Sequence, residues 1–260
     1  MKARQVINKL RIKEGKLMDA YEKKYAALVY RAIYRQIEDY EQTQSIDDYT
    51  LFKEIEKLYL DVTPLFAKNQ YKQLDSFNTA KSLELFLGVW DTWIKTWAQT
   101  NLAVKVKNIN DTTRELIANI VAEGTNEGYT FDQISKQLLE YFKGDKGKNR
   151  AKMIARTEVG NAVNMGKKRS AEDWETDSGI EVYKMWIHRP SKEPRGWHYM
   201  LDDNKGYPKN HLWTVTIPKG NTDLMDTPHD PNASAGNVIN CACTVQFVSR
   251  RFAERLNRNQ

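Results

Sequence analysis

The sequence predicts an α+β fold: a mainly helical N-terminal region followed by a smaller C-terminal α+β domain with a short antiparallel sheet. Apolar residues recur every three or four positions through the first 110 residues, as in an amphipathic helix, and only Pro64 interrupts them. After residue 178, short apolar runs alternate with turn-rich segments that hold six of the seven prolines. We therefore divide the chain into a helical region at 1–110 and a second domain at 111–260.

The helical region contains a stripe of large aromatic side chains. Phe86, Trp90, Trp93 and Trp97 follow one another at steps of four, three and four, so they share one helix face. Two interpretations are open. The stripe packs inside the protein, or it faces a partner helix, and its four members are then candidates for a partner contact.

Helix start signals divide the next part of the chain. Residues 110–113 (Asn-Asp-Thr-Thr) predict the start of one short helix, and Thr130 with Gln133 forms a capping box for another. We expect a loop over 142–148, then a long helix capped by Asn149 that runs to about Trp174, with Gly179 ending the helical segment. Strands are predicted at 181–188, 212–217 and 242–248.

Composition excludes several classes of protein. The 260 residues include 40% hydrophobic and 28% charged side chains, which is typical of a soluble globular chain. No run approaches the ~20 apolar residues of a membrane span, and the N-terminus lacks an apolar signal segment. The two cysteines cannot form a disulfide framework, so we expect cytosolic synthesis. The common phosphate-loop, dinucleotide, zinc-protease and serine-hydrolase motifs are absent.

Basic residues are densest between 143 and 169. The formal net charge is +6, so charge alone does not identify a nucleic-acid-binding protein. This stretch can meet DNA phosphates without reading sequence, or it can be an ordinary solvated helix face. The DNA-facing candidates are Lys146, Lys148, Arg150 and Lys152.

Glu158 lies on or near the apolar stripe of the predicted long helix, three residues after Ala155 and four before Ala162. A buried carboxylate needs a cation or several hydrogen-bond donors. We expect an arginine from elsewhere to pair with it, and Arg195 is one candidate. Gly160, Ala162 and Gly166 on the same helix predict a close approach by another element.

Polar residues spaced three and four apart follow the first predicted strand. Arg195, His198 and Asp202 can form a hydrogen-bond network that fixes a loop, which we favour. Alternatively, His198 and Asp202 act with Glu158 in general acid–base chemistry. His188, His211 and His229 are lone histidines among polar residues and are given no role in this chemistry.

Cys241 and Cys243 enter the last predicted strand. Side chains two residues apart on a flat strand are separated by ~6.6 Å, which is too wide for two thiolates around one zinc ion. Zinc binding by Cys241, Cys243, His198 and His229 therefore requires a bend at Ala242. Reduced, buried cysteines and no cofactor are the expectation, and zinc is the alternative.

Six weak motifs stand in order within residues 150–248. They are Ala155-Arg-Thr-Glu158 with Asn161 and Asn164, Gly179-Ile180, Lys184-x-Trp186, Arg195-x-x-His198-x-x-x-Asp202, Pro228-x-Asp230-Pro231, and Asn240-Cys-x-Cys243. In this order the chain resembles the Mu F-like head-morphogenesis family of tailed bacteriophages. Asp203, where the family often has glycine, and Ala242, where it has a basic residue, are departures. The resemblance makes 111–260 a Mu F-like domain with a structural motif core that includes Arg156, Glu158, Asn161, Arg195, His198, Asp202, Asp230, Asn240, Cys241 and Cys243.

The resemblance implies a minor capsid protein, made in the host cytoplasm and located in the capsid interior near the portal vertex. Its implied partners are the portal protein, the packaged double-stranded DNA without sequence preference, the major capsid or scaffolding protein, and a second copy of the chain. We expect no membrane contact and no enzymatic turnover. The two alternatives are a nuclease or toxin-like enzyme using Glu158, His198 and Asp202, and a non-specific DNA-binding module.

Overall fold

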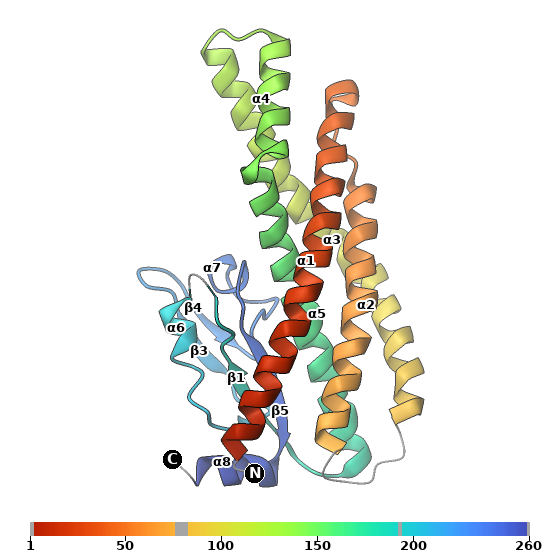
Figure 1. The fold of residues 1–260 in the computed structure, drawn as a ribbon, viewed down its shortest axis with the longest axis vertical. Helices are drawn as coiled ribbons and strands as arrows, with labels where there is room; N and C mark the ends of the chain where they lie inside the picture. Colours follow the sequence, from red (N-terminus) through yellow and green to blue (C-terminus); the bar gives the residue numbers. More distant parts are fainter. Residues whose placement is uncertain (1–2, 76–82, 192–193, 259–260) are drawn as a thin grey trace.

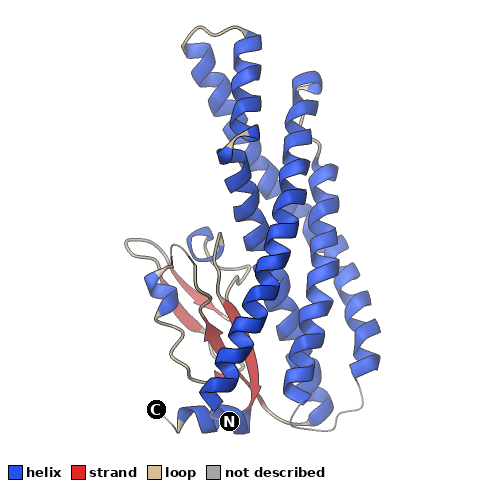
Figure 2. Ribbon diagram, in the orientation of Figure 1, coloured by secondary structure: helices blue, strands red, loops and turns tan. Residues whose placement is uncertain are grey.

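Five helices build the first two thirds of the chain in the computed structural model, which describes residues 3–75, 83–191 and 194–258. They lie lengthwise in an elongated bundle, and a small β-containing part lies beside its lower half, against α1 and α5 (Figure 1, Figure 2). The predicted α+β fold is confirmed. The helices are α1 (Ala3–Thr43), α2 (Asp48–Asp75), α3 (Leu83–Asn126), α4 (Phe131–Lys143) and α5 (Asp145–Ser178).

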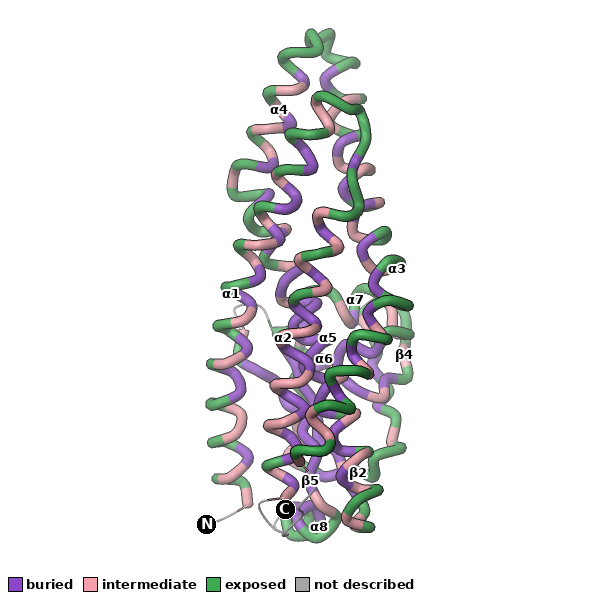
Figure 3. Tube along the Cα trace, turned by 90° about the vertical axis from the view of Figure 1, so that its right-hand side faces the viewer, coloured by how far each residue is buried: buried purple, intermediate pink, exposed green. Residues whose placement is uncertain are grey.

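The core of the bundle lies where α5 packs between α1 and α2. Buried apolar residues follow the inner faces of these helices, whereas the connection between α3 and α4 at the far end is exposed (Figure 3). Gly166 permits a close approach of α5 to α2, because a Cβ there would come within 2.3 Å of the Thr63 carbonyl oxygen. The predicted close approach at Gly166 is thus confirmed, and Pro64 beside it lies inside α2 without ending the helix.

Two predicted helix boundaries are wrong. Helix α3 does not begin at residues 110–113 but continues through them. Asn110 is buried there, and the Thr113 hydroxyl donates a hydrogen bond to the Ile109 carbonyl one turn earlier. The loop predicted at 142–148 shrinks to Gly144, which caps both α4 and α5 in place of Asn149. This tight connection needs a second glycine, since a Cβ at Gly147 would lie 2.0 Å from the Phe142 carbonyl oxygen. The capping box at Thr130 and the Gly179 C-cap are confirmed.

The aromatic stripe faces the inside of the bundle. Trp90 is fully buried, packs on Tyr71 of α2 and donates a hydrogen bond of 2.8 Å to Asp173 of α5. Trp97 packs on Tyr59, and Phe86 and Trp93 are partly buried. The assignment of Phe86, Trp90, Trp93 and Trp97 as partner-facing is therefore corrected: the stripe holds α3 to α2 and α5.

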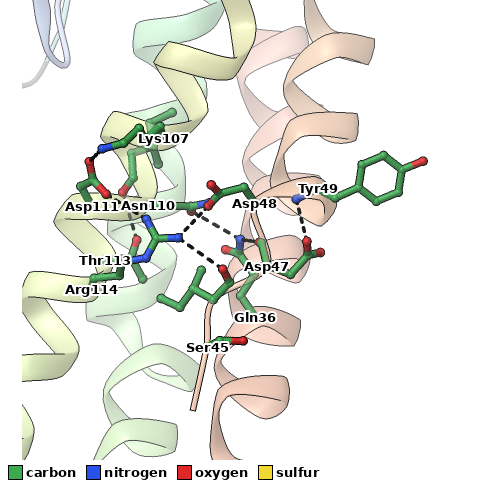
Figure 4. A network of polar contacts seen from close by, with 12 residues as sticks. Gln36, Ser45, Asp47, Asp48, Tyr49, Lys107, Asn110, Asp111, Thr113 and Arg114 are labelled. Atoms are coloured by element: carbon green, nitrogen blue, oxygen red, sulfur yellow. Dashed lines mark hydrogen bonds and ion pairs between the residues drawn. The ribbon is translucent and has the colours of Figure 1, made fainter. Parts of the chain in front are cut away.

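A polar network fixes the turn between α1 and α2 to α3 (Figure 4). Asp48 at the start of α2 accepts hydrogen bonds of 2.8 Å from Asn110 and from Arg114. Gln36 of α1 donates to the Asp47 carbonyl and, at 3.4 Å, to Asn110. Three helices are thereby joined by polar groups, of which Gln36 and Asn110 are buried.

Residues 182–258, which we call the sheet module, form two small antiparallel sheets. One sheet has the strand order β2-β1-β5 and the other is the β3–β4 hairpin. The first packs on α2 and α5 through Val245 and Phe247, and on Ile7 of α1 and α8 through Met185 and Ile187. The elements are β1 (Val182–Ile187), α6 (Gly196–Tyr199), β2 (Tyr207–Pro208), β3 (Trp213–Thr216), β4 (Thr222–Met225), α7 (Ala235–Val238), β5 (Thr244–Ser249) and α8 (Arg250–Asn257).

Helix α1 also joins the sheet module through charged side chains. Arg189 donates to the carbonyl of Gly15 and pairs with Asp19 and Glu22. Glu14 pairs at 2.6 Å with Lys167 of α5, and Lys167 also donates to Gln246 of β5 at 3.0 Å.

Among the described residues, no helix combines the length and apolar character that a membrane span requires.

Candidate metal-binding site

Two segments of the sheet module bring His198, Cys241 and Cys243 together. His198 lies on α6, and the two cysteines lie in the segment just before β5, which begins at Thr244. One ligand atom from each of the three residues lies within 4.8 Å of the others, and all three residues are buried. The strand predicted at 242–248 therefore begins too early in the sequence. Because the cysteines lie in the turn before β5 and not on a flat strand, the wide spacing expected between their sulfur atoms does not apply.

The hydrogen bonds of His198 fix which ring nitrogen carries the proton. Its Nε2 lies 3.1 Å from the Asn237 side-chain oxygen, which can only accept. The Asn237 amide is oriented by its own donation to the Val215 carbonyl and to Asp223. The proton therefore sits on Nε2, and the lone pair of Nδ1 points at the two sulfur atoms.

The segment that carries Cys241 and Cys243 bends so that both sulfur atoms lie near Nδ1 of His198. The Sγ atoms of Cys241 and Cys243 lie 3.4 Å and 3.9 Å from it, and the Cys243 amide donates to the Cys241 sulfur at 3.4 Å. Hydrogen bonding from the Cys243 thiol is the largest effect that lowers the pKa of Cys241 well below its ordinary value, and nearby His229 and His198 add to it. The same hydrogen bond is the largest effect that raises the pKa of Cys243 well above its ordinary value, and burial adds to it.

His229 lies next to this group from a different loop. Its side chain is buried, it contributes to the lowered pKa of Cys241, and neither ring nitrogen has a hydrogen-bond partner among the described residues. Its backbone has φ +61°, a conformation that costs free energy in a residue other than glycine. Gly160 of α5 makes room for the ring, since a Cβ there would lie 2.3 Å from Nε2.

Helix α5 supports the loops that carry these residues. Asn164 donates at 2.9 Å to the Pro228 carbonyl, and its oxygen accepts from Thr244 and from the Val245 amide. The Asn161 amide, oriented to satisfy both its groups, donates to the His229 carbonyl at 2.9 Å. Asp230 accepts from the amides of Asp226 and Asn232, which closes the turn around His229.

The arginines of the predicted motif core hold the turn before Cys241. Arg156 pairs with Glu22 of α1 and donates at 3.2 Å to Asn240, whose amide donates to Thr157 at 2.9 Å. Asn240 has φ +58°, which reverses the chain direction ahead of the cysteines. Arg195 donates at 2.6 Å to the Ile239 carbonyl. It therefore does not pair with Glu158, and that expectation is wrong.

Glu158 and Asp202 have other partners and other environments. Glu158 faces α2 and α3, where it accepts from Tyr59 at 2.7 Å and pairs with Lys105 at 3.3 Å. Asp202 accepts from the His188 amide and pairs with Arg11 of α1. Burial raises the pKa of Asp202 and opposes that ion pair. Glu158 lies two positions before Gly160, hence on the other side of α5 from His229.

The basic stretch only partly forms an exposed surface. Lys146, Lys148 and Lys152 are exposed, but Arg150 turns inward and donates at 3.0 Å to the Ile109 carbonyl and to Thr113. Burial lowers the pKa of Arg150. Its assignment as a DNA-facing residue is corrected. Lys148 and Lys152 share a cavity wall with acidic side chains of α1, Asp19 and Glu22.

Sequence reasoning missed two contributors to this region. Asn237 fixes the ring of His198, yet it stands in no motif and no spacing rule singles it out. Lys184 belongs to a motif, but its role emerges only in three dimensions, where it is fully buried and binds the carbonyl and side chain of Asp226.

A cavity of about 200 Å³ beside the cysteines is lined by His188, Arg195, His198 and Asn240, among others.

Comparisons of this chain with protein-family models, curated proteins and solved structures found no match.

Proposed function

We propose that this chain is a minor head protein of a tailed bacteriophage, made in the host cytoplasm and located inside the capsid near the portal vertex, where it aids head assembly or genome delivery. The proposal begins from six motifs that stand in the family's order between residues 150 and 248. One observation carries it beyond the sequence. Residues from distant motifs contact one another: Arg156 contacts Asn240, and His198 contacts both cysteines.

In this proposal the motif residues build and orient one structural unit and do not turn over a substrate. The polar motif residues of α5 hold the loops of the sheet module, and Lys184 holds the turn at Asp226. Glu158, His198 and Asp202, the residues of the enzyme alternative, are engaged with separate groups. Those contacts support structural roles.

The proposed principal partner is the portal protein, and the major capsid or scaffolding protein and a second copy of the chain are further partners. Packaged double-stranded DNA is proposed to meet Lys146, Lys148 and Lys152, which are exposed. Such contacts neutralise phosphates without reading bases, so affinity should fall steeply with salt. Replacing the three lysines by glutamine should flatten that salt dependence, and Lys95→Gln on α3 is the matched exposed control.

The decisive experiment is quantitative mass spectrometry of purified, DNA-filled particles from the source phage, scaled to the portal subunit. A constant ratio of this chain to portal subunits is the expected result. Detection only in the lysate, with none in washed particles, would overturn the proposal. Particles that carry His198→Gln should contain less of the chain, because that variant weakens the sheet module.

The enzyme alternative has its own test. Purified protein incubated with RNA, DNA and divalent metal ions should leave the nucleic acids intact. Cleavage that co-purifies with the chain and disappears in the Asp202→Asn variant would instead favour a nuclease.

A further inference from the structure

We infer that Cys241, Cys243, His198 and His229 bind one zinc ion in a closed site that ties α6 and the 226–231 turn to the start of β5. Two thiolates and two imidazoles are a common ligand set for structural zinc. The inference is independent of the proposed function, since the metal content of the purified protein does not depend on where the protein acts.

The separations of His198 Nδ1 from the two sulfur atoms match those in a zinc tetrahedron. With Zn–S of ~2.3 Å and Zn–N of ~2.05 Å, a sulfur and a nitrogen on one tetrahedral ion lie ~3.6 Å apart. The two observed Nδ1-to-Sγ distances, 3.4 Å and 3.9 Å, bracket that value. Both sulfurs approach the same lone pair, whereas an S–H···N hydrogen bond accounts for only one of them.

The surroundings of His198 are those of a metal ligand. A ligating histidine usually donates its other ring N–H to a fixed acceptor, which sets the tautomer and the ring orientation. Asn237 supplies that acceptor, is fully buried, and is itself held by Val215 and Asp223. The Trp197 indole also donates to the same Asn237 oxygen at 2.9 Å, which further fixes the amide.

His229 is the fourth ligand of the inferred site. It stands outside the group of three residues whose ligand atoms lie within 4.8 Å of one another, so its ring must shift toward the cysteines to bind the ion. His229 is 2% exposed, and both of its ring nitrogens lack a hydrogen-bond partner among the described residues. A buried polar atom without a hydrogen-bond partner destabilises the folded state, so a compensating interaction is expected at this position. A metal ion beside Cys241 provides it. Gly160 and the left-handed backbone at His229 keep the ring there.

The first test measures metal in the full-length protein purified without added chelator. Elemental analysis should find about one zinc ion per chain in the wild type and much less in Cys243→Ser. His211→Gln is the matched control, because His211 stacks on Tyr207 in the same module and is not one of the four ligands. Zinc-free wild-type protein that is folded by circular dichroism, and that takes up no zinc when it is added, would overturn the inference.

A second test does not depend on any ligand variant folding. Wild-type protein stripped with a chelator and reloaded with Co²⁺ should show tetrahedral d–d bands and thiolate-to-cobalt charge transfer. A folded protein without these bands after cobalt addition would contradict a two-thiolate site. The chelator should also lower the melting temperature of the wild type.

Two variants separate ligation from positioning. Asn237→Leu should weaken zinc binding by about 10–100-fold, as other outer-shell substitutions do, while the cobalt spectrum keeps its thiolate bands. His229→Ala should weaken zinc binding and change the d–d bands, because water replaces an imidazole. An unchanged affinity and spectrum in His229→Ala would overturn the assignment of His229 as the fourth ligand.

Discussion

The two faces of α5 meet two regions that are held together in different ways. Toward the bundle, α5 contributes apolar side chains such as Val159 and Val163, which pack against α1 and α2. Toward the sheet module, it contributes amides and glycines, with Asn164 bonded to two loops and Gly160 beneath His229. At these positions α5 meets the bundle through buried apolar area and the loops of the module through directed polar contacts, while Ala171 and Trp174 of α5 pack on Val245 and Phe247 of β5.

This difference determines how each region should respond to change. Apolar packing is non-directional, so a substitution in the bundle costs roughly what its lost area and cavity cost. Polar contacts inside the module have fixed geometry, and the loss of one partner leaves the other buried and unsatisfied. A small change in the module should therefore alter the candidate metal site, even where global stability barely changes.

The largest effect on stability is expected from Trp90→Ala in the bundle. The variant removes a fully buried indole that packs on Tyr71 and Phe86 and leaves a cavity between α2, α3 and α5. The free energy of unfolding should fall by about 3–5 kcal/mol in urea denaturation. Leu85→Ala on the same helix is the control, since Leu85 is 76% exposed and its loss should cost little. Equal effects of the two would show that the stripe is not core.

A similar but smaller loss is expected where α1, α5 and β5 share a buried ion pair. Lys167→Met leaves Glu14 buried, with Gln73 as its remaining side-chain donor in the described part of the chain, and should cost about 3 kcal/mol. The double variant Glu14→Leu with Lys167→Met should recover most of that loss, because no charge is then left unpaired. Urea denaturation of the single and double variants tests this. A double variant as unstable as the single one would mean that packing, and not charge burial, controls this contact.

Sequence analysis predicted the bundle better than the module, and the physical reason is the range of the contacts. Helical periodicity, the Thr130 capping box and the Gly179 C-cap are local signals, and all three were correct. The partners of Glu158 lie 99 and 53 residues away, on α2 and α3, and no spacing rule could choose Tyr59 and Lys105 over Arg195.

The candidate site shows the same limit. The sequence supplied the four residues of the zinc alternative, but it treated the cysteine pair as part of a flat strand. The left-handed backbone at Asn240 turns the chain before β5 and brings both sulfurs to one nitrogen of His198. Neither that turn nor the role of Asn237 leaves a pattern that periodicity can detect.

Two glycines of α5 allow a direct comparison of the regions. A Cβ at Gly166 would lie 2.3 Å from a backbone oxygen of α2, so Gly166→Ala must push two helices apart, at about 1–3 kcal/mol. A Cβ at Gly160 would meet only the His229 ring at the same distance. Because alanine is more favourable than glycine in a helix interior by ~1 kcal/mol, Gly160→Ala should change the stability of the zinc-free protein little.

For zinc affinity, the order of the two variants should be the reverse of their order in stability. Gly160→Ala displaces His229 and should weaken zinc affinity, whereas Gly166→Ala should leave it unchanged. Thermal denaturation and zinc titration of the two purified variants measure both quantities. If Gly160→Ala loses as much stability as Gly166→Ala and binds zinc normally, the module is packed like the bundle and the distinction between the two faces of α5 fails.

The smallest effect concerns the pH dependence of the module. Hydrogen bonds from Ser234 chiefly lower the pKa of Asp223, and Asn237 donates to the same carboxylate. The unfolded chain then binds the proton more tightly than the folded chain. The stabilisation from Asp223 is therefore complete above its ordinary pKa of ~3.9 and is lost as pH falls through the lower folded value.

Asp223→Asn should accordingly be less stable than the wild type at neutral pH. The melting temperatures of the two proteins should become equal as the pH falls into the acid range. Asp91→Asn is the control, because Asp91 pairs with Lys95 on the exposed face of α3, where a lost ion pair costs under ~1 kcal/mol and is screened by salt. Melting temperatures recorded at steps of pH below neutrality test this. A constant difference at every pH would mean that Asp223 acts through its shape and not its charge. The orientation of Asn237, and through it that of His198, would then rest on packing alone.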